Sequence, residues 1–367
     1  MTVSRPAAVV VLAAGAGTRM RSQIPKVLHP ICGASLLDHV LAAARELSPR
    51  ELIVVVGHGR RDVMAHLARH APDARVVVQD RQGGTGHAVR VVIEEAGLGR
   101  GTVLVTYGDT PLLRGRTLAS LVREHAVQRA AATALTTLME DPTGYGRIVR
   151  DDESGFTGIV EETDATPSQR AITEINSGVY AFEADVLADA VKRLPTDNAK
   201  GEEYLTDVVA ILRAEGHHVA SVLLNDCDEV RGVNDRAQLA QARRILNGRI
   251  LDGWMRAGVT IVDPLTTFID AGVVLARDVE IGPGTQLEGT TVVEAGAYLG
   301  PGCHLRDCTV GRGAAVTHAV CVSAEIGPGA TVEPFTYLPP GSKVEARSPG
   351  RRGRGGGRPN RKGAQQA

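Results

Sequence analysis

A glycine-rich segment followed by basic residues is the first feature of this sequence that could do chemistry. Residues 12–20 read LAAGAGTRM, and Lys26 follows after Pro25. Small side chains let backbone N–H groups approach the oxygens of a triphosphate, and Arg19 and Lys26 could neutralise phosphate charge. The spacing matches neither the dinucleotide-binding fingerprint nor the ATPase phosphate loop. A plain glycine turn with basic surface residues is the alternative.

An acidic residue at the end of an apolar run is the second such feature. Asp109 follows the strand-like run 103–106 in YGDTP, and a carboxylate there is costly to bury unless a cation pairs with it. Mg²⁺ that bridges phosphate oxygens is the natural partner, and capping of the next helix is the alternative. Asn234, in GVNDR, could cap a helix or supply a neutral second metal ligand.

Weaker signals lie elsewhere in the first half of the chain. Gln79 and the GTGH segment at 84–87 could read a nucleobase edge, although a tight strand-to-helix turn explains the glycines equally well. Polar or glycine interruptions at 144–147, 159–161 and 174–176 could line a sugar pocket. No spacing supports a Ser–His–Asp, Cys–His or paired-carboxylate arrangement. This fits phosphoryl transfer, which depends on positioning and charge neutralisation more than on a protein nucleophile.

The elements that must position these residues alternate between strands and helices. Short apolar runs separated by helical patterns predict the strands 7–12, 52–56, 76–78 and 103–106. We therefore predict an α/β fold with a Rossmann-like, mostly parallel sheet. Ligands bind beyond the carboxyl ends of such strands, so the loops at 13–26, 79–86 and 107–111 should share one crevice.

The apolar period changes after a helix predicted at 234–257. Apolar residues recur every six positions from Ile269 to Leu305, and the repeat continues to Val344 with two slips of register, before Val310 and before Ile326. Three short strands per 18-residue coil predict a short left-handed parallel β-helix of about four coils. The predicted parts are a first domain at 1–233, the linker helix at 234–257, the β-helix at 258–345 and a disordered basic Gly/Arg tail at 346–367.

The composition excludes several classes of protein. With 367 residues, 43% hydrophobic and 23% charged, the chain has ample material for packed cores. It has no apolar stretch long enough to span a membrane and no signal-peptide pattern, so we expect a cytoplasmic protein. The five scattered cysteines indicate neither a disulfide framework nor a zinc site. The basic tail lacks aromatic residues for base stacking, so nucleic-acid binding is not expected.

Taken together, these segments resemble the bacterial family of bifunctional N-acetylglucosamine-1-phosphate uridylyltransferases / glucosamine-1-phosphate N-acetyltransferases. The resemblance is colinear over residues 7–340. It rests on LAAGAGTRM (12–20), PKVLH (25–29), GTGHA (84–88), YGDTPLL (107–113), DPTGYGRI (141–148), GIVEETDAT (158–166), EINSGVY (174–180), EEYLTD (202–207) and GVNDRAQL (232–239). It implies a nucleotidyltransferase that makes UDP-N-acetylglucosamine and pyrophosphate from UTP and N-acetylglucosamine 1-phosphate with Mg²⁺, for peptidoglycan and other cell-envelope precursors.

The resemblance also implies roles for particular residues. The positions that match nucleotide-binding residues are Leu12, Ala13, Ala14, Gly15, Lys26, Gln79, Gly84 and Thr85. Those around the sugar are Tyr107, Gly146, Glu161, Asn176 and Asn234. Asp109 and Asn234 match the metal ligands, and the catalytic set is Arg19, Lys26 and Asp109. The implied reaction is in-line attack of the sugar-phosphate oxygen on the α-phosphorus of UTP.

The chain departs from the family at several positions. Ala16 and Gly83 replace bulkier residues, and Asp235 stands where a second Asn is usual, which adds negative charge beside the proposed metal site. The family's acetyltransferase residues come after the point at which the resemblance stops, and Pro339 stands where the family has Arg. We therefore expect no acetyl transfer by this truncated chain.

The family resemblance also implies how the chain assembles. The solenoid usually trimerises in this family, so we expect a homotrimer that is weakened by the shortened β-helix. Two other functions stay open. One is a sugar-1-phosphate nucleotidylyltransferase of other specificity, and the other is a catalytically silent trimeric scaffold.

Overall fold

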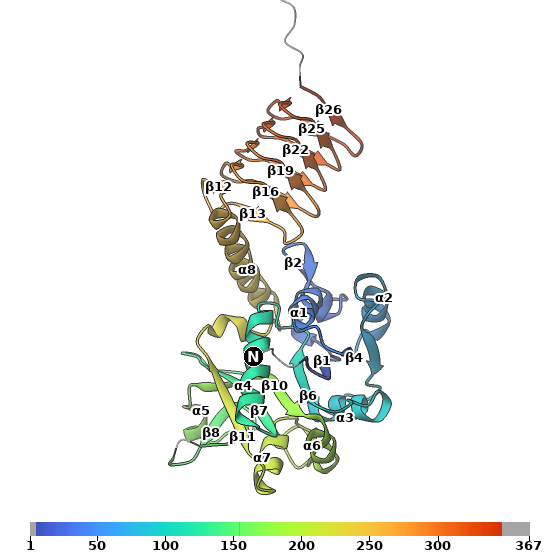
Figure 1. Ribbon diagram of the computed structural model, residues 1–367, viewed down its shortest axis with the longest axis vertical. Helices are drawn as coiled ribbons and strands as arrows, with labels where there is room; N and C mark the ends of the chain where they lie inside the picture. The colour runs from blue at the N-terminus through green and yellow to red at the C-terminus, as the bar shows by residue number, and fades with distance from the viewer. Residues whose placement is uncertain (1–4, 154, 347–367) are drawn as a thin grey trace, which may run out of the picture. The chain divides into compact units, whose positions relative to one another are not determined.

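The computed structural model describes residues 5–153 and 155–346. The chain divides into two compact units, one up to Arg249 and one from Ile250 (Figure 1). Helix α8 (Arg236–Arg256) contributes residues to both units. The tail predicted as disordered lies outside the described residues, apart from Ala346.

The first unit is built on one mixed sheet, with four parallel and four antiparallel strand pairs among the described residues, so it is less parallel than the sequence predicted. Its strands follow the order β11-β7-β10-β6-β1-β4-β5, and β8 and β9 extend it beside β10. Their bounds are β1 Ala8–Ala13, β4 Glu51–Val56, β5 Arg75–Val78, β6 Thr102–Tyr107, β7 Ala132–Leu138, β8 Arg147–Arg150, β9 Phe156–Val160, β10 Glu174–Glu183 and β11 Val219–Leu224. Strand β10 runs antiparallel to both neighbours, β6 and β7. The predicted α/β, Rossmann-like class is confirmed.

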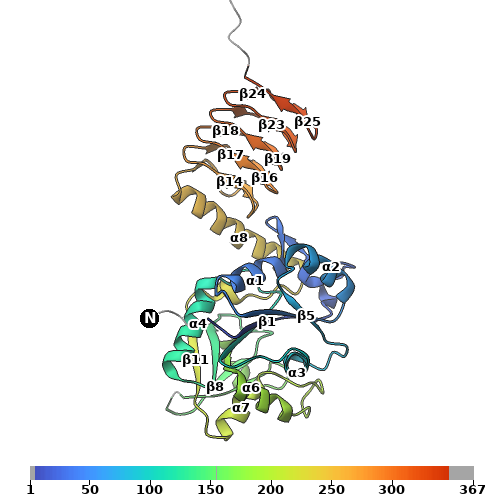
Figure 2. The same ribbon diagram turned by 45° about the vertical axis from the view of Figure 1, so that its right-hand side comes forward.

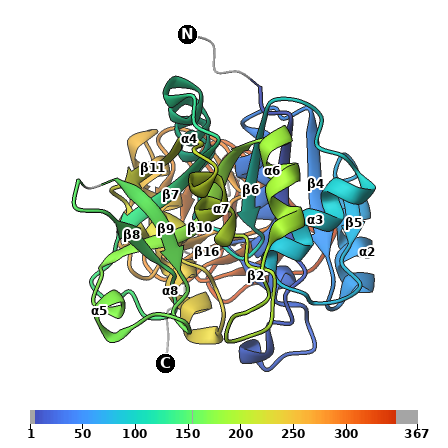
Figure 3. The same cartoon turned by 90° about the horizontal axis from the view of Figure 1, so that it is seen from below.

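Helices cover both faces of this sheet. They are α1 Leu36–Arg45, α2 Arg60–His70, α3 Thr85–Glu95, α4 Gly115–Gln128, α5 Pro167–Arg170, α6 Ala184–Ala190 and α7 Asp207–Ala214. In Figure 2, α1 and α2 lie above the sheet, and α3, α6 and α7 lie below it. Figure 3 shows α3, α6 and α7 in front of the strands. Short elements complete the unit: the hairpin β2 Pro30–Ile31 and β3 Ala34–Ser35, and the 3₁₀ turns η1 Thr18–Met20, η2 Lys26–Leu28, η3 Val191–Arg193 and η4 Cys227–Val230.

Strand β1 shows why these sequences form a two-faced core. Its residues are all buried, and successive side chains point to opposite faces of a sheet. Val10 therefore joins the cluster under α3 and α6, whereas Val9 and Val11 join the cluster under α1 and α4. A continuous apolar run of this kind is typical of a parallel strand that is covered on both faces.

The second unit is a solenoid of three parallel sheets, each with five strands. The sheets have the orders β12-β15-β18-β21-β24, β13-β16-β19-β22-β25 and β14-β17-β20-β23-β26. The strands are Thr260–Ile261, Phe268–Ile269, Val274–Leu275, Glu280–Ile281, Gln286–Glu288, Val292–Val293, Tyr298–Leu299, His304–Arg306, Thr309–Val310, Ala315–Val316, Val320–Val322, Glu325–Ile326, Thr331–Val332, Tyr337–Leu338 and Lys343–Val344, for β12 to β26. This arrangement is consistent with the predicted left-handed β-helix.

The six-residue period reflects one inward side chain on each strand. On the second sheet Leu287 pairs in register with Leu305, which pairs with Cys321, and all three are fully buried. The described part of the solenoid has five strands in each sheet, so it is longer than the predicted four or so coils. Ile250 and Trp254 of α8 pack against the same core. Among the described residues, no helix has the length and apolar character needed to cross a bilayer.

Candidate active site

The loops that follow strands β1, β5 and β6 line one cavity of about 440 Å³, at the sheet edge where parallel strands end. The sequence-predicted residues on its wall are Leu12, Ala13, Ala14, Gly15, Lys26, Gln79, Gly84, Thr85, Tyr107, Asp109 and Asn234. The structure therefore brings together every residue proposed for the nucleotide and both proposed metal ligands. The crevice predicted from strand order is present.

Lys26 joins three segments that are far apart in the sequence. Its Nζ forms an ion pair with Oδ2 of Asp109 and donates to Oδ1 of Asn234 at 3.0 Å. The side chains of Lys26 and Asp109 are only 13% and 17% exposed, so each charge depends on the other for compensation. A Cβ at Gly17 would lie 2.6 Å from Cβ of Lys26, and Gly17 has a φ of +59°. Glycine at this position lets the first loop close over the lysine.

The same contacts test whether this site suits a magnesium ion. Oδ2 of Asp109 and Oδ1 of Asn234 both lie against a single cationic centre, the Nζ of Lys26. Carboxylate and amide oxygens are hard ligands of the kind that Mg²⁺ prefers. The donor atoms of Asp109 and Asn234 therefore fit a small divalent cation, which these two residues would hold.

Backbone and capping contacts resolve two of the alternatives left open by the sequence. Asp109 does not cap α4, because this helix begins at Gly115 with Arg114 as its N-cap. The N-terminus of α8 is capped by Asp235, whose Oδ1 accepts from the backbone N of Gln238 at 2.8 Å. The side chain of Asn234 is thus not the cap of α8. The charge of Asp235 lies at a helix N-terminus, where a negative charge is favourable.

The GTG segment is held by hydrogen bonds to residues 203–205, a stretch without regular secondary structure. Gly86 N donates to the carbonyl of Glu203 at 2.8 Å, Glu203 N donates to the carbonyl of Gly83 at 2.8 Å, and Leu205 N donates to Oγ1 of Thr85 at 3.0 Å. Gly84 has a φ of +101°, and a Cβ there would overlap the carbonyl of Glu203. Close packing against residues 202–205 therefore requires this glycine.

The side chains of Gln79 and Arg90 hold the cavity wall around the GTG segment in place. Nε2 of the buried Gln79 donates to the carbonyl of Gly84 at 3.0 Å and lies 2.8 Å from Nδ1 of His87. Arg90 on α3 binds Glu203 through two contacts, Nη2 to Oε1 at 2.7 Å and Nε to Oε2 at 3.0 Å. A two-pronged pair of this kind fixes orientation as well as distance. It ties residues 202–205 to the helix that follows the loop.

Four of the residues proposed for the sugar, Tyr107, Gly146, Glu161 and Asn176, form a cluster, whereas Asn234 lies against Lys26. A Cβ at Gly178 would overlap the Tyr107 ring, so this glycine, with a φ of +78°, makes room for the ring. Oδ1 of Asn176 accepts from the hydroxyl of Tyr180 at 2.9 Å, and Asn176 N donates to the carbonyl of Gly146 at 2.9 Å. Tyr107 also lines the cavity, so it is shared by both groups.

Burial dominates the electrostatics of this cluster. It raises the pKa of Tyr107 and of Tyr180 well above the usual range for phenols, and the nearby Glu161 carboxylate adds to the effect. Burial also raises the pKa of Glu161, although Thr206 Oγ1 donates to its Oε1 at 3.2 Å. The cluster therefore offers neutral phenols and one hydrogen-bonded carboxyl group. Such groups can bind the hydroxyl and amide groups of a sugar.

Some site residues lie elsewhere than expected, and others were not predicted. Arg19 is exposed on η1 and is not among the residues that line the cavity. Gln82, Lys200 and Glu202 do line it. Glu202 belongs to the EEYLTD motif, which supported the family resemblance but to which no binding or catalytic function was assigned. No spacing or repeat singles out Gln82 or Lys200.

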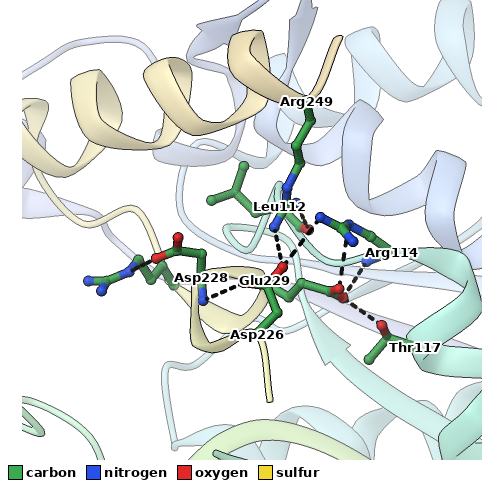
Figure 4. A network of polar contacts seen from close by, with 8 residues as sticks. Leu112, Arg114, Thr117, Asp226, Asp228, Glu229 and Arg249 are labelled. Atoms are coloured by element: carbon green, nitrogen blue, oxygen red, sulfur yellow. Dashed lines mark hydrogen bonds and ion pairs between the residues drawn. The ribbon is translucent and has the colours of Figure 1, made fainter. Parts of the chain in front are cut away.

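A polar network supports the two loops that carry Asp109 and Asn234 (Figure 4). The buried carboxylate of Glu229 accepts from Oγ1 of Thr117 at 2.6 Å and from the backbone N of Arg114 at 3.3 Å. Arg249 Nη1 donates to the carbonyl of Leu112 at 2.6 Å, and both Arg249 and Arg114 reach Oδ2 of Asp226. The chain after β6 is thereby joined to the η4 segment that leads to Asn234.

Comparisons with known proteins identify the family of this chain. A sequence model of the MobA-like NTP transferase domain matches residues 9–172. The chain is 55% identical to the bifunctional protein GlmU of Streptomyces avermitilis over 350 residues, which cover 95% of this chain and 73% of that protein. The bifunctional protein GlmU of Thermobifida fusca is 55% identical over 332 residues, which cover 89% of this chain and 69% of that relative. That of Mycolicibacterium vanbaalenii is 51% identical over 352 residues.

The pair of Arg90 and Glu203 gives a stability prediction with a defined pH dependence. Its hydrogen bonds hold the pKa of Glu203 below its usual range. A lowered pKa in the folded chain adds stability above the ordinary value of about 4.3, and this stability is lost as the pH falls through the folded pKa. We expect Glu203→Gln to lower the free energy of unfolding by about 1.5–3 kcal/mol at pH 7, and the difference from the parent chain to shrink below about pH 4.

Urea denaturation at a series of pH values measures this difference. Glu94→Gln is the matched control, because Glu94 contacts the same Arg90, at 3.0 Å, from an exposed position on α3. Its effect should stay within about 0.5 kcal/mol. A Glu203→Gln deficit that is equal at pH 7 and pH 3 would contradict the assignment.

Proposed function

Because the chain belongs to the family of bifunctional GlmU proteins, and its first unit contains an NTP transferase domain, we propose that it joins UTP to N-acetylglucosamine 1-phosphate. The products are UDP-N-acetylglucosamine, a precursor for the cell envelope, and pyrophosphate. A sugar-phosphate oxygen forms a bond to the α-phosphorus as the bond to the bridging oxygen of pyrophosphate breaks. The observation that carries the proposal is the meeting of Lys26, Asp109 and Asn234 at one point of the cavity wall.

The residues around the phosphates would act by position and charge. The loop after β1 offers small side chains and free approach at Gly15, where a Cβ would meet nothing within 4 Å. Lys26 would neutralise charge on the phosphate oxygens in the transition state. Asp109 and Asn234 would hold Mg²⁺, which when bound neutralises phosphate charge. Arg19 follows the same loop and would add a second positive charge beside the leaving pyrophosphate.

This reaction places little demand on proton transfer. The second pKa of a phosphate monoester is about 6, so the attacking oxygen of the sugar phosphate is largely ionised at neutral pH. The site then needs no side chain to remove a proton from the nucleophile. A cavity with small residues along its first loop, and with Lys26, Lys200, Asp109 and Glu202 on its wall, suits such a reaction.

The fixed orientation of Gln79 supports uracil as the base. Its Nε2 lies against the Gly84 carbonyl and Nδ1 of His87, so among the described residues Oε1 is the atom left to accept from a ligand. Uracil presents an N3–H donor between two carbonyls, whereas N3 of cytosine carries no hydrogen. An accepting Oε1 therefore favours UTP over CTP. The sugar would bind through Tyr107, Gly146, Glu161, Asn176 and Asn234.

Release of pyrophosphate is the direct test. We expect the purified chain to release it from UTP and N-acetylglucosamine 1-phosphate in the presence of Mg²⁺, and Asp109→Ala to reduce the rate at least about 100-fold, because charge on the phosphates would lose its compensation. Asp235→Asn is the control, since it removes a neighbouring carboxylate but keeps a helix-capping side chain.

Other outcomes separate the alternatives. Faster release with dTTP or ATP than with UTP would indicate a nucleotidylyltransferase of other specificity. No release from a folded sample would favour the catalytically silent scaffold.

We also propose that the β-helix forms a homotrimer, as the family resemblance implies. Apolar residues at the first, outward position of several strands support this proposal, because they would otherwise face water: Phe268, Val274, Val292, Val320 and Tyr337 are all exposed in the single chain. Light scattering should give three times the 38.6 kDa of one chain. Val320→Glu should reduce the trimer fraction, whereas Val127→Glu, on α4 of the first unit, should not. A monomer in the parent sample would reject the trimer.

Acetyl transfer is a separate question for these 367 residues. We predict that this polypeptide does not transfer acetyl groups to glucosamine 1-phosphate. Incubation of the purified chain with acetyl-CoA and glucosamine 1-phosphate tests it, and formation of N-acetylglucosamine 1-phosphate would show that the expectation is wrong.

A further inference from the structure

Three metal-ligating side chains meet on the surface of the first unit, outside the cavity. They are Asp38 on α1 and His66 and His70 on α2, and one donor atom of each lies within 4.8 Å of the others. Nε2 of His66 is 2.8 Å from Oδ1 of Asp38. The rings of His66 and His70 are stacked, with centroids 4.3 Å apart. None of the three residues lines the nucleotide cavity.

The Asp38 carboxylate is already oriented for such a role. Its Oδ2 accepts from the backbone N of Ser35 at 3.0 Å and from Oγ of Ser35 at 2.7 Å, as part of the box that caps α1. Its Oδ1 is thereby turned toward His66. Hydrogen bonds of this kind behind a ligand fix its orientation and strengthen metal binding. Asp38 and His66 are mostly buried, at 20% and 15% exposure, whereas His70 is exposed.

The donor set and its spacing suit a zinc-type ion. Residues i and i+4 of a helix share one face, so His66 and His70 point the same way from α2. Two imidazoles and one carboxylate, with water as the fourth ligand, form a common tetrahedral site. Metal bonds of about 2.0–2.1 Å place tetrahedral donors roughly 3.4 Å apart. The donor atoms now lie within 4.8 Å of one another, so a movement of up to roughly 1.4 Å by the exposed His70 ring would bring them to that distance.

We propose that Asp38, His66 and His70 bind a divalent transition metal of the zinc class. The ion would cross-link α1 to α2. These helices border the segment that carries Lys26: α1 begins soon after it, and the N-cap of α2 is Gly59, where a Cβ would lie 2.7 Å from Cγ of Pro25. The effect of the metal is therefore stabilisation of this half of the unit. The competing account is a metal-free hydrogen bond between His66 and Asp38.

Zinc binding to the full chain tests the proposal. Calorimetric titration with Zn²⁺, with millimolar Mg²⁺ present, should show one tight equivalent, and Zn²⁺ should raise the melting temperature because it binds the folded chain. Co²⁺ in place of Zn²⁺ should give the intense visible absorption of a tetrahedral site. His66→Gln and His70→Gln should each weaken binding at least about tenfold, since each removes a ligand.

Two controls keep the outcomes distinct. Arg69→Gln changes the neighbouring exposed residue on α2 and should bind Zn²⁺ as the parent does. Asp109→Asn removes the proposed magnesium ligand and should also leave this zinc equivalent intact, so the result does not depend on the proposed reaction. The proposal fails if the parent binds no more tightly than His70→Gln, or if Asp109→Asn abolishes binding.

Discussion

The ion pair between Lys26 and Asp109 is the interaction on which the site depends. Asp109 lies two residues after the end of β6, whose central residues are fully buried, so its carboxylate emerges where water is scarce. Such a charge is stable only beside a cation, and the cation comes from a residue 83 positions earlier. Asn234, 208 positions from Lys26, then completes the contact. Three loops are thus gathered around one charge, and the small residues of the first loop are what let them approach.

The loops that carry Asp109 and Asn234, and the GTG turn, are also held by charged groups that do not line the cavity. Glu229 and Arg249 tie the chain after β6 to the η4 segment, and Arg90 holds Glu203 and with it the backbone that packs on the GTG turn. A buried charge that loses its partner is strongly destabilising, so these contacts resist local rearrangement. The rigidity suits phosphoryl transfer, in which the protein contributes mainly by holding groups in place.

The sequence predicted the parts of the structure that have a short-range signature. The fully buried strands β1, β4 and β6, the shared crevice and the six-residue period of the solenoid all follow from local apolar patterns. The antiparallel insertion of β10 between β6 and β7 did not follow, because strand pairing over long separations leaves no periodic trace. The same reason explains why Lys200 was missed. Asp235, which looked like excess charge beside a metal site, is explained by its capping contact, which only the structure reveals.

The glycines of the sequence motifs show why residue type and spacing alone overestimate how many residues contact a ligand. A side chain at Gly17 would press on Lys26, one at Gly84 would overlap the Glu203 carbonyl, and one at Gly178 would overlap Tyr107. These three glycines are required by packing within the protein, whatever the site binds. Gly15 differs, because it is exposed on the cavity wall and a Cβ there would meet nothing within 4 Å. Packing gives no reason for its bare backbone, whereas close approach by a phosphate does.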